Sequence, residues 1–355
     1  MKNFEKIRFV LVGSGWRARY YLRIAEALPD VFECLAVLCR KEEKADEIQK
    51  EFGVRTVFSE EECLSLKPDL AVVAVSKPSI AQVSLRWMQH GITVLCETPA
   101  AVKEEDLKKL EDCVKKDGKL VTAEQYHLYP VYQSLISLVQ KGVIGRPQYL
   151  YLSAAHEYHA ASLIRTFLQV SEEEAYTLIG KEFPYESVRT MDRQREYHDG
   201  TIEIKKRQVC LGSFEKGKTA LYDFSAEQYH SPIRLDMVKV QGVKGEIAGT
   251  RVSYLDENWN AEEECLRVES RMVNRRYQNP NLKTVKEIVS VKWKDEVLYE
   301  PYFGLCGLSE DESAMAFLLY KAGLYAMGKG ENPYPLYKAA ADARMAMKMT
   351  EVFNS

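Results

Sequence analysis

The sequence lacks the features of a protein that spans a membrane, is secreted, or is stabilised by a structural metal ion. Its 355 residues contain no apolar run near the roughly 20 residues needed to cross a bilayer, and no apolar signal region precedes the first strand pattern. None of the eight cysteines forms a Cys-x-x-Cys pair, so neither a zinc site nor a disulfide framework is predicted. We therefore expect buried thiols in the reducing cytoplasm and no bound metal.

An excess of charge of one sign is also missing. The 49 Lys and Arg residues nearly balance the 52 Asp and Glu residues, for a formal net charge of −3. Such a chain offers no general attraction to nucleic acid or to an anionic membrane, so neither is an expected partner. The length favours two domains, because single cores rarely grow beyond about 250–300 residues.

The most informative segment is the glycine-containing turn that follows the first predicted strand. Residues 7–12 are an apolar run, Gly13-Ser14-Gly15-Trp16-Arg17-Ala18 follows, and a helical pattern continues to residue 28. This order is typical of dinucleotide binding: the first glycine permits the turn, the second admits a pyrophosphate, and the small Ala18 allows close packing. The helix N-terminus adds N–H donors and a partial positive charge. A tight turn without a ligand is the alternative.

Strands and helices alternate in the first third of the chain. Apolar runs at 7–12, 33–39, 70–76, 92–96 and 119–123 alternate with helical patterns at 16–28, 41–51, 78–90 and 103–117. This spacing predicts a doubly wound parallel sheet of the Rossmann type, in an α/β domain over residues 1–123. Ligands bind beyond the carboxyl ends of such strands, where Ser76 and Glu97 lie.

From about residue 124 the pattern changes to that of an α+β domain. Helical patterns lie near 129–141 and 159–170, and a third runs from the capping box Ser309-x-x-Glu312 to residue 327. Strand patterns occupy 147–155, 209–214, 219–224 and 233–243, a last helix reaches residue 353, and residues 256–282 have no clear pattern. We expect residues 124–355 to form a substrate-binding domain around a mainly antiparallel sheet.

The end of the second predicted strand indicates the choice of cofactor. NAD sites place Asp or Glu about 20 residues past the glycines, but this strand ends in Cys39-Arg40-Lys41. No carboxylate repels a 2′-phosphate there, and Arg binds phosphate through two parallel hydrogen bonds, so we predict NADP(H) over NAD(H). Two solvated residues before a helix are the alternative. The candidate cofactor-binding residues are Gly13, Ser14, Gly15, Trp16, Arg17, Arg40, Lys41, Ser76 and Glu97.

Several motifs together resemble the Gfo/Idh/MocA family, the relatives of glucose–fructose oxidoreductase and inositol dehydrogenase. They are the glycine turn, the Ala45–Gly53 segment, the run Gly91-Ile92-Thr93-Val94-Leu95-Cys96-Glu97-Thr98-Pro99-Ala100, Tyr126 to Pro130, Gly142-Val143-Ile144-Gly145 and His159. The resemblance covers most of the chain. It implies hydride transfer between a nicotinamide and a sugar, polyol or related hydroxy compound. It also implies a large open sheet, through which we expect a homodimer or homotetramer.

Two departures from the family pattern concern acid–base chemistry. The family has Glu-Lys-Pro where this chain has Glu97-Thr98-Pro99, and Asp where this chain has Ala155, four residues before His159. Threonine is uncharged and does not titrate near neutral pH. The resemblance therefore implies an oxidoreductase with non-standard acid–base residues. Lys77 is either a substitute ammonium group or a solvated lysine.

Histidine and tyrosine side chains remain as catalytic candidates, because an imidazole titrates near neutrality and suits removal of a hydroxyl proton. We expect His159 as the principal acid/base, with His156 three residues away. Tyr126 or His127 is the expected substrate contact, and Glu97 the group that orients the nicotinamide ribose. Partly buried, hydrogen-bonded histidines are the alternative. Residues 220–234 either close the substrate pocket or form an oligomer interface.

Three functions are compatible with these patterns. The leading one is an oxidoreductase acting on a sugar-derived hydroxy or keto compound. The second is a redox-neutral lyase or glycosidase that recycles its cofactor, and the third is a dinucleotide-binding sensor or scaffold without turnover.

Overall fold

The computed structural model describes residues 4–277 and 279–354, and the chain divides into two compact units. Unit 1 comprises Met1–Gln125 and Asp311–Ala343, and unit 2 comprises Tyr126–Glu310 and Arg344–Ser355. The first crossing lies close to the expected boundary at residue 123. The segment Asp311–Ala343, which the sequence-based division placed in the second domain, belongs to unit 1.

Side-chain packing explains why the late segment joins unit 1. Its helix α9 (Glu310–Ala326) packs against the first strand at Gly323, where an added Cβ would lie 2.5 Å from the Ile7 side chain. Glu312 of the same helix forms a buried ion pair with Arg23, with 2.6 Å between Oε1 and Nε. These contacts join residues some 300 positions apart, and no local sequence pattern reports them.

Unit 1 is built on a six-stranded parallel sheet in the order β3-β2-β1-β4-β5-β6. The strands are β1 (Ile7–Val12), β2 (Phe32–Leu38), β3 (Thr56–Val57), β4 (Leu70–Val73), β5 (Thr93–Cys96) and β6 (Leu120–Thr122). The strand order reverses between β1 and β4, the point at which such sheets bind ligands. The predicted doubly wound fold is confirmed.

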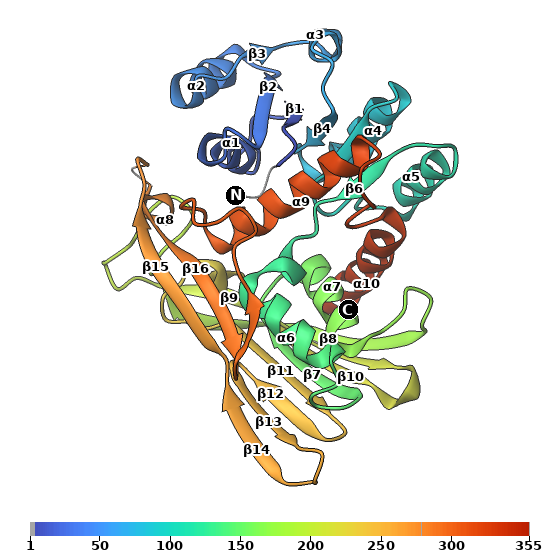
Figure 1. Cartoon of the computed structure of the whole chain (residues 1–355), viewed down its shortest axis with the longest axis vertical. Coiled ribbons are helices and arrows are strands. Elements are labelled where there is room, and N and C mark those ends of the chain that lie inside the picture. The colour runs from blue at the N-terminus through green and yellow to red at the C-terminus, as the bar shows by residue number, and fades with distance from the viewer. Residues whose placement is uncertain (1–3, 278, 355) are drawn as a thin grey trace. The chain divides into compact units, whose positions relative to one another are not determined.

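Five helices of unit 1 connect these strands, and α9 joins the unit from later in the chain (Figure 1). They are α1 (Ala18–Ala27), α2 (Glu42–Phe52), α3 (Glu60–Ser65), α4 (Lys77–Gln89), α5 (Glu104–Lys115) and α9. The sequence did not predict β3 or α3, which are two and six residues long. A signal for α3 was present, because Ser59 and Glu62 form a capping box in the structure.

Unit 2 contains a large, mainly antiparallel sheet, as predicted, in the order β14-β13-β12-β11-β7-β10-β9-β8. The strands are β7 (Pro147–Ser153), β8 (Tyr176–Val188), β9 (Ile202–Phe214), β10 (Thr219–Phe224), β11 (Met237–Gly242), β12 (Gly245–Ala248), β13 (Arg251–Leu255) and β14 (Ala261–Cys265). The β7–β10 pair is parallel. A smaller antiparallel sheet contains β15 (Arg267–Asn274), β16 (Thr284–Trp293) and β17 (Glu296–Tyr299).

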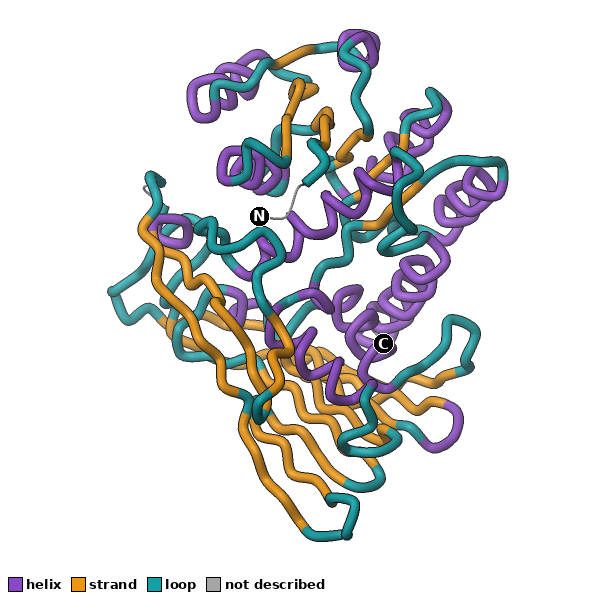
Figure 2. The backbone as a smooth tube through the Cα atoms, in the orientation of Figure 1, coloured by secondary structure: helices purple, strands orange, loops and turns teal. Residues whose placement is uncertain are grey.

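Helices lie on one face of the large sheet and form the core of unit 2 with it (Figure 2). The helical elements that begin in unit 2 are η1 (Tyr126–Leu128), α6 (Pro130–Gln140), α7 (Glu157–Leu168), η2 (Glu215–Gly217), η3 (Ala226–Tyr229) and α8 (Pro280–Lys283); α10 (Leu336–Asn354) begins in unit 1 and ends in unit 2. The segment 256–282 supplies β14 and β15, whose mostly exposed residues give no apolar alternation. Residue 278 of that segment lies outside the described residues.

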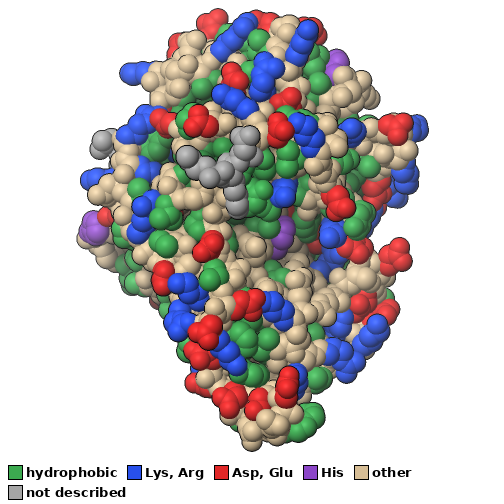
Figure 3. Space-filling model, viewed as in Figure 1, with side chains coloured by type: hydrophobic (Ala, Val, Ile, Leu, Met, Phe, Trp, Pro, Cys, Tyr) green, Lys and Arg blue, Asp and Glu red, His purple; other side chains and the backbone are tan. Residues whose placement is uncertain are grey.

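Membrane-spanning helices, metal-ligand clusters and the state of the cysteines can be examined in the described residues. Within 4–277 and 279–354, no helix has the length and apolarity that crossing a membrane requires, and no three metal-ligating side chains gather. All eight cysteines are free thiols; Cys39, Cys63, Cys96 and Cys210 are buried, but Cys265 is exposed. The expectation of buried thiols was therefore wrong for Cys265, because β14 is exposed. Charges of both signs are interspersed on the face seen in Figure 3.

Candidate functional site

A cleft of about 850 Å³ lies in unit 1 at the carboxyl ends of β1, β2 and β4. Its lining includes the glycine turn from Gly13 to Arg17, Arg40 and Lys41 after β2, and Ser76 after β4. All the predicted cofactor-binding residues except Glu97 therefore line one cleft. Lys77, the first residue of α4, is exposed.

The two glycines of the turn meet different surroundings. Gly13 has φ +113°, and an added Cβ would lie only 2.4 Å from the carbonyl oxygen of Ala74, so the strands pack closely only around glycine. A Cβ on Gly15 would meet nothing within 4 Å. No side chain caps α1 at Arg17. The turn thus combines a fixed backbone, open space and a helix N-terminus, which are the requirements for a bound pyrophosphate.

The charge of the cleft is strongly positive. The cations in its lining are Arg17, Arg40, Lys41, Lys44 and Arg86, and the carboxylate among the described lining residues is Glu60. Lys44 pairs with Glu47, and Arg86 pairs with Glu60. In the described part of the chain, neither Arg40 nor Lys41 has an ion-pair partner. These two cations remain available to an anionic ligand.

Arg17 and Glu97 belong to a polar network beneath the turn. Arg17 Nε donates to Glu97 Oε1 over 3.0 Å, and its Nη1 donates to Asp311 Oδ2 over 2.7 Å. Tyr21 donates to the same Glu97 oxygen over 2.7 Å, and Gln125 donates to Asp311 over 2.9 Å. Burial and then the Glu97 charge raise the pKa of Tyr21. Glu97 is only 6% exposed, and in this position it holds Arg17 rather than facing the cleft.

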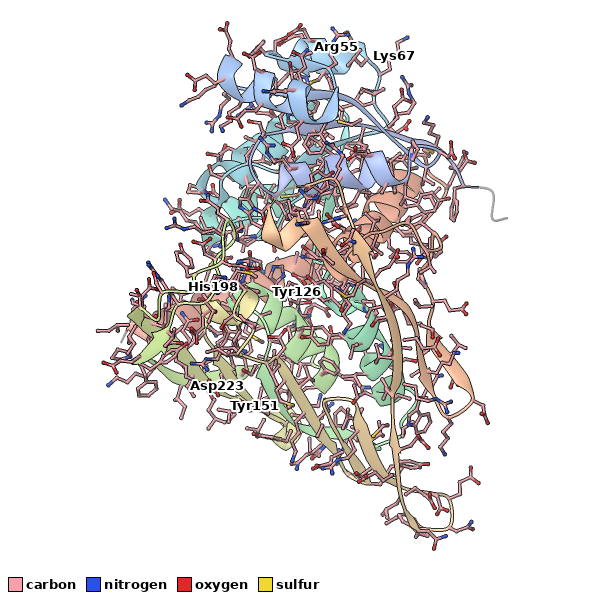
Figure 4. All side chains as sticks on the ribbon, turned by 90° about the vertical axis from the view of Figure 1, so that its left-hand side faces the viewer. Arg55, Lys67, Tyr126, Tyr151, His198 and Asp223 are labelled. Atoms are coloured by element: carbon pink, nitrogen blue, oxygen red, sulfur yellow. The ribbon has the colours of Figure 1, made fainter. Side chains whose placement is uncertain are left out.

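A cluster of histidine and tyrosine rings lies in unit 2, where η1 meets α7. The His159 ring centroid lies 4.2 Å from that of Tyr126, 4.3 Å from that of Tyr158 and 4.8 Å from that of His156. His159 is 5% exposed and Tyr126 is 8% exposed; Figure 4 labels Tyr126. His127 follows Tyr126 in η1 and is half-buried. The structure therefore brings three of the four predicted catalytic residues into ring contact.

Tyr229 of η3 completes this His/Tyr cluster. The His156 backbone N–H donates to Tyr229 Oη over 2.9 Å, and His156 Nδ1 also contacts that oxygen. Burial raises the pKa of Tyr229 far above its usual range, so its hydroxyl stays protonated. The sequence left residues 220–234 open between a substrate pocket and an oligomer interface. The contact with His156 assigns Tyr229 to the cluster.

Two further tyrosines extend the cluster along α6. The Tyr126 and Tyr129 rings stack with 4.6 Å between centroids, and Tyr129 and Tyr132 are stacked with 5.9 Å between centroids. Tyr129 and Tyr132 were not predicted from the sequence, although their spacing of three residues from Tyr126 onward was a signal for one helical face. Elsewhere, Thr98 is half-buried after β5 and Ala155 is fully buried.

The strand order, the glycine turn and the cationic cleft define unit 1 as a dinucleotide-binding Rossmann domain. Residues 7–125 match the model of a family described as "Oxidoreductase family, NAD-binding Rossmann fold" (GFO_IDH_MocA). Residues 7–125 are thus similar to the Gfo/Idh/MocA oxidoreductases, which confirms the predicted resemblance for this part of the chain.

The curated relatives are more distant and match only in part. The chain is 25% identical over 158 residues to "scyllo-inositol 2-dehydrogenase (NADP(+)) IolU" of Bacillus subtilis, which covers 43% of this chain and 48% of the relative. It is 24% identical over 142 residues to "D-glucoside 3-dehydrogenase" of Escherichia coli, which covers 39% and 40%. The matches thus span less than half the length of either relative.

Solved structures resemble the whole chain. An oxidoreductase from Agrobacterium radiobacter, in complex with NAD+, L-tartaric acid and magnesium, superposes with a TM-score of 0.67 at 13% identity, covering 99% of this chain and 97% of that one. The WlbA dehydrogenase from Bordetella pertussis, in complex with NADH and UDP-GlcNAcA, has a TM-score of 0.61 at 14% identity, covering 99% and 97%. At these identities the likeness shows a shared fold.

Proposed function

We propose that this protein is an NADP(H)-dependent oxidoreductase that transfers a hydride to or from a sugar, a polyol or a sugar-derived hydroxy or keto compound. The observation that supports it best concerns Arg40 and Lys41. Both line the cleft that is built around Gly13, and neither forms an ion pair with any described residue. One relative named as an NADP-linked scyllo-inositol dehydrogenase and another named as a D-glucoside 3-dehydrogenase support this substrate class.

The cofactor would be held by residues that line the cleft. Gly13, Ser14, Gly15 and the N-terminus of α1 suit the pyrophosphate, Trp16 and Ser76 flank them, and Arg40 with Lys41 suits the 2′-phosphate. When bound, the nicotinamide supplies the hydride acceptor or donor. Glu97 acts on the turn by fixing Arg17 through their 3.0 Å ion pair.

The substrate would bind at the His/Tyr cluster. His159 exchanges a proton with the reacting hydroxyl, because an imidazole titrates near the working pH. Tyr126 and His127 contact the substrate, and His156 is held by its contacts with Tyr229. This arrangement replaces the chemistry that Thr98 and Ala155 cannot provide.

We also propose a homodimer or homotetramer through the open face of the large sheet. Ile179 and Leu211 are direct cross-strand partners on β8 and β9 and are 67% and 36% exposed. Tyr151 and Asp223, labelled in Figure 4, lie on neighbouring strands of the same sheet and form a 3.0 Å hydrogen bond. Exposed apolar side chains such as Ile179 and Leu211 are common at protein interfaces. Sedimentation of wild type and Ile179→Asp tests it, and a monomeric wild type contradicts it.

Turnover assays test the catalytic proposal. Cofactor-stripped protein is mixed with NADP+ or NAD+ and with scyllo-inositol, methyl glucoside or levoglucosan, and nicotinamide absorbance is recorded while product is analysed. Reduction of NADP+ with at least one compound is expected. Nucleotide binding without any product indicates a sensor or scaffold. Product formation without net reduction indicates the redox-neutral alternative.

A further inference from the structure

A carboxylate lies beside the His/Tyr cluster on a neighbouring strand. Asp236 immediately precedes β11, and β11 pairs with β7 so that Met237 lies opposite Ser153. Three residues after Ser153 the chain reaches His156. The Gln228 side chain ties the two segments together by donating to the carbonyl oxygens of Ser153 (3.2 Å) and Leu235 (3.3 Å). The register therefore places Asp236 next to the start of α7.

Three residues of unit 2 face the Asp236 carboxyl. Tyr132 of α6 forms a hydrogen bond with it, Tyr229 of η3 lies within its field, and Glu310 repels it. Part of the residue is exposed, although neighbouring atoms shield the carboxyl from much of the water. This loss of water and then the Glu310 charge raise the pKa of Asp236 to about 7.

The groups beyond these neighbours also matter to the titration. Lys286 opposes the rise that burial causes in the pKa of Glu310, and Tyr299 faces Glu310 as well. Tyr229 is faced by His156, Tyr126, Glu157 and Asp236. Burial raises the pKa of both Tyr132 and Tyr229, so neither phenol is itself a base at neutral pH.

The proposed function creates a need that Asp236 can meet. Oxidation of a CH–OH group to a carbonyl breaks the C–H bond with hydride transfer to the nicotinamide, and it breaks the O–H bond with release of a proton. His159, which would receive that proton, is only 5% exposed. A buried base must return its proton to water before the next turnover.

We propose that Asp236, with Tyr229 and His156, forms the proton exit of the substrate site. The inference rests on the proposed function. The hydroxyl proton passes to the histidine pair, and His156 Nδ1–H gives a proton to Tyr229 Oη. The Tyr229 hydroxyl proton then passes towards the Asp236 carboxylate, whose charge acts on Tyr229 and which is hydrogen-bonded to Tyr132. Asp236 then releases it to solvent at its exposed side. In the direction of reduction every step runs backwards.

The test combines kinetics with a direct titration. With scyllo-inositol and NADP+ as the probe pair, Asp236→Asn is expected to lower kcat by about 10- to 100-fold. Added imidazole buffer should restore much of the loss, because a small acid–base can replace a proton acceptor but not a structural contact. The matched control is Asp295→Asn, at an exposed turn residue, and it should keep wild-type kcat at every buffer concentration.

A titration of carboxyl-labelled aspartate by NMR reads Asp236 without turnover. A midpoint near pH 7 that falls in Glu310→Gln, but not in Glu257→Gln, supports the relay. A midpoint near the ordinary aspartate value overturns it. So does a wild type that turns over while Asp236→Asn has unchanged kcat. Absence of turnover in wild type with every compound tested overturns the proposed function, and the relay with it.

Discussion

The dinucleotide cleft of unit 1 and the His/Tyr cluster of unit 2 are built in different ways. The cleft depends on backbone: Gly13 is fixed by the Ala74 carbonyl, and both Gly15, which has open space around it, and the start of α1 line the cleft. The cluster depends on side chains from η1, α6, α7 and η3, which meet ring against ring. Backbone sites need a short local motif, whereas side-chain sites need the whole tertiary fold.

The two sites also differ in what holds their charge. In the cleft, cations outnumber carboxylates, and Arg40 and Lys41 have no partner among the described residues. In unit 2, aromatic hydroxyls and imidazoles are held close together, and the Asp236 and Glu310 carboxyls beside them repel one another. The first arrangement suits binding of an anion, and the second suits movement of a proton. Substitutions in one site should therefore leave the other function intact.

The substitution His159→Ala is expected to have the largest effect, because it should remove turnover and leave cofactor binding intact. Because this side chain is assigned the proton transfer, kcat should fall by about 100-fold or more, while the Kd for NADPH stays at the wild-type value. Steady-state kinetics and fluorescence titration measure the two quantities. His198→Ala, which removes a histidine with an 84% exposed side chain, should change neither. Equal turnover in wild type and His159→Ala rules out this role.

The substitution Arg40→Asp is expected to do the converse and change the cofactor preference of the cleft. Loss of a charge-assisted hydrogen bond and the added repulsion should lower the preference for NADPH over NADH by about 100-fold. The change in the ratio of the two Kd values is the readout. Arg55→Asp, at an exposed arginine that does not line the cleft, is the control. If Arg40→Asp keeps the wild-type ratio, Arg40 does not read the 2′-phosphate.

The two glycines should separate folding from binding within the cleft. Gly13→Ala forces a Cβ against backbone at positive φ and should cost about 1–3 kcal/mol of unfolding free energy. Gly15→Ala should keep the wild-type Tm but weaken NADPH binding by about 10-fold, because its methyl group takes space a phosphate needs. Thermal unfolding and nucleotide titration distinguish them. Equal Tm values for the two variants would contradict the packing argument.

The smallest effect concerns pH and Asp236. Its pKa in the folded protein is raised to about 7, so folding holds its proton more tightly than the unfolded chain does. That contribution is complete below the ordinary aspartate pKa near 4 and is lost as pH rises through 7. The Tm difference between Asp236→Asn and wild type should therefore be a few degrees more favourable to the variant at pH 8 than at pH 4. A pH-independent difference would be evidence against the raised pKa.

Local pattern predicted most of unit 1 and less of unit 2. The apolar runs of β1, β4 and β5 are fully or almost fully buried, so they can be recognised as strands from the sequence alone. Strands such as β8 and β15 have exposed faces with Ile179 or Met272 outward, and their alternation does not point to a core. The return of Asp311–Ala343 to unit 1 depends on long-range contacts such as Arg23–Glu312.

The same distinction applies to the sites. Gly13 to Arg17, Arg40 and Ser76 were predicted because each follows a strand, and all of them line one cleft. Tyr229 and Asp236 reach the cluster through η3 and the β7–β11 register, which no spacing in the chain reports. Glu97 was expected to face the cofactor, but its carboxylate is taken up by Arg17 and Tyr21.

The measurement that tests the central claim most directly is a fluorescence titration of cofactor-stripped wild type with NADPH and, in parallel, with NADH. Saturable binding with NADPH clearly preferred is the predicted result, since it requires both the glycine turn and the cations Arg40 and Lys41 after β2. Binding of neither nucleotide, or a preference for NADH, would contradict the assignment of the cleft to NADP(H).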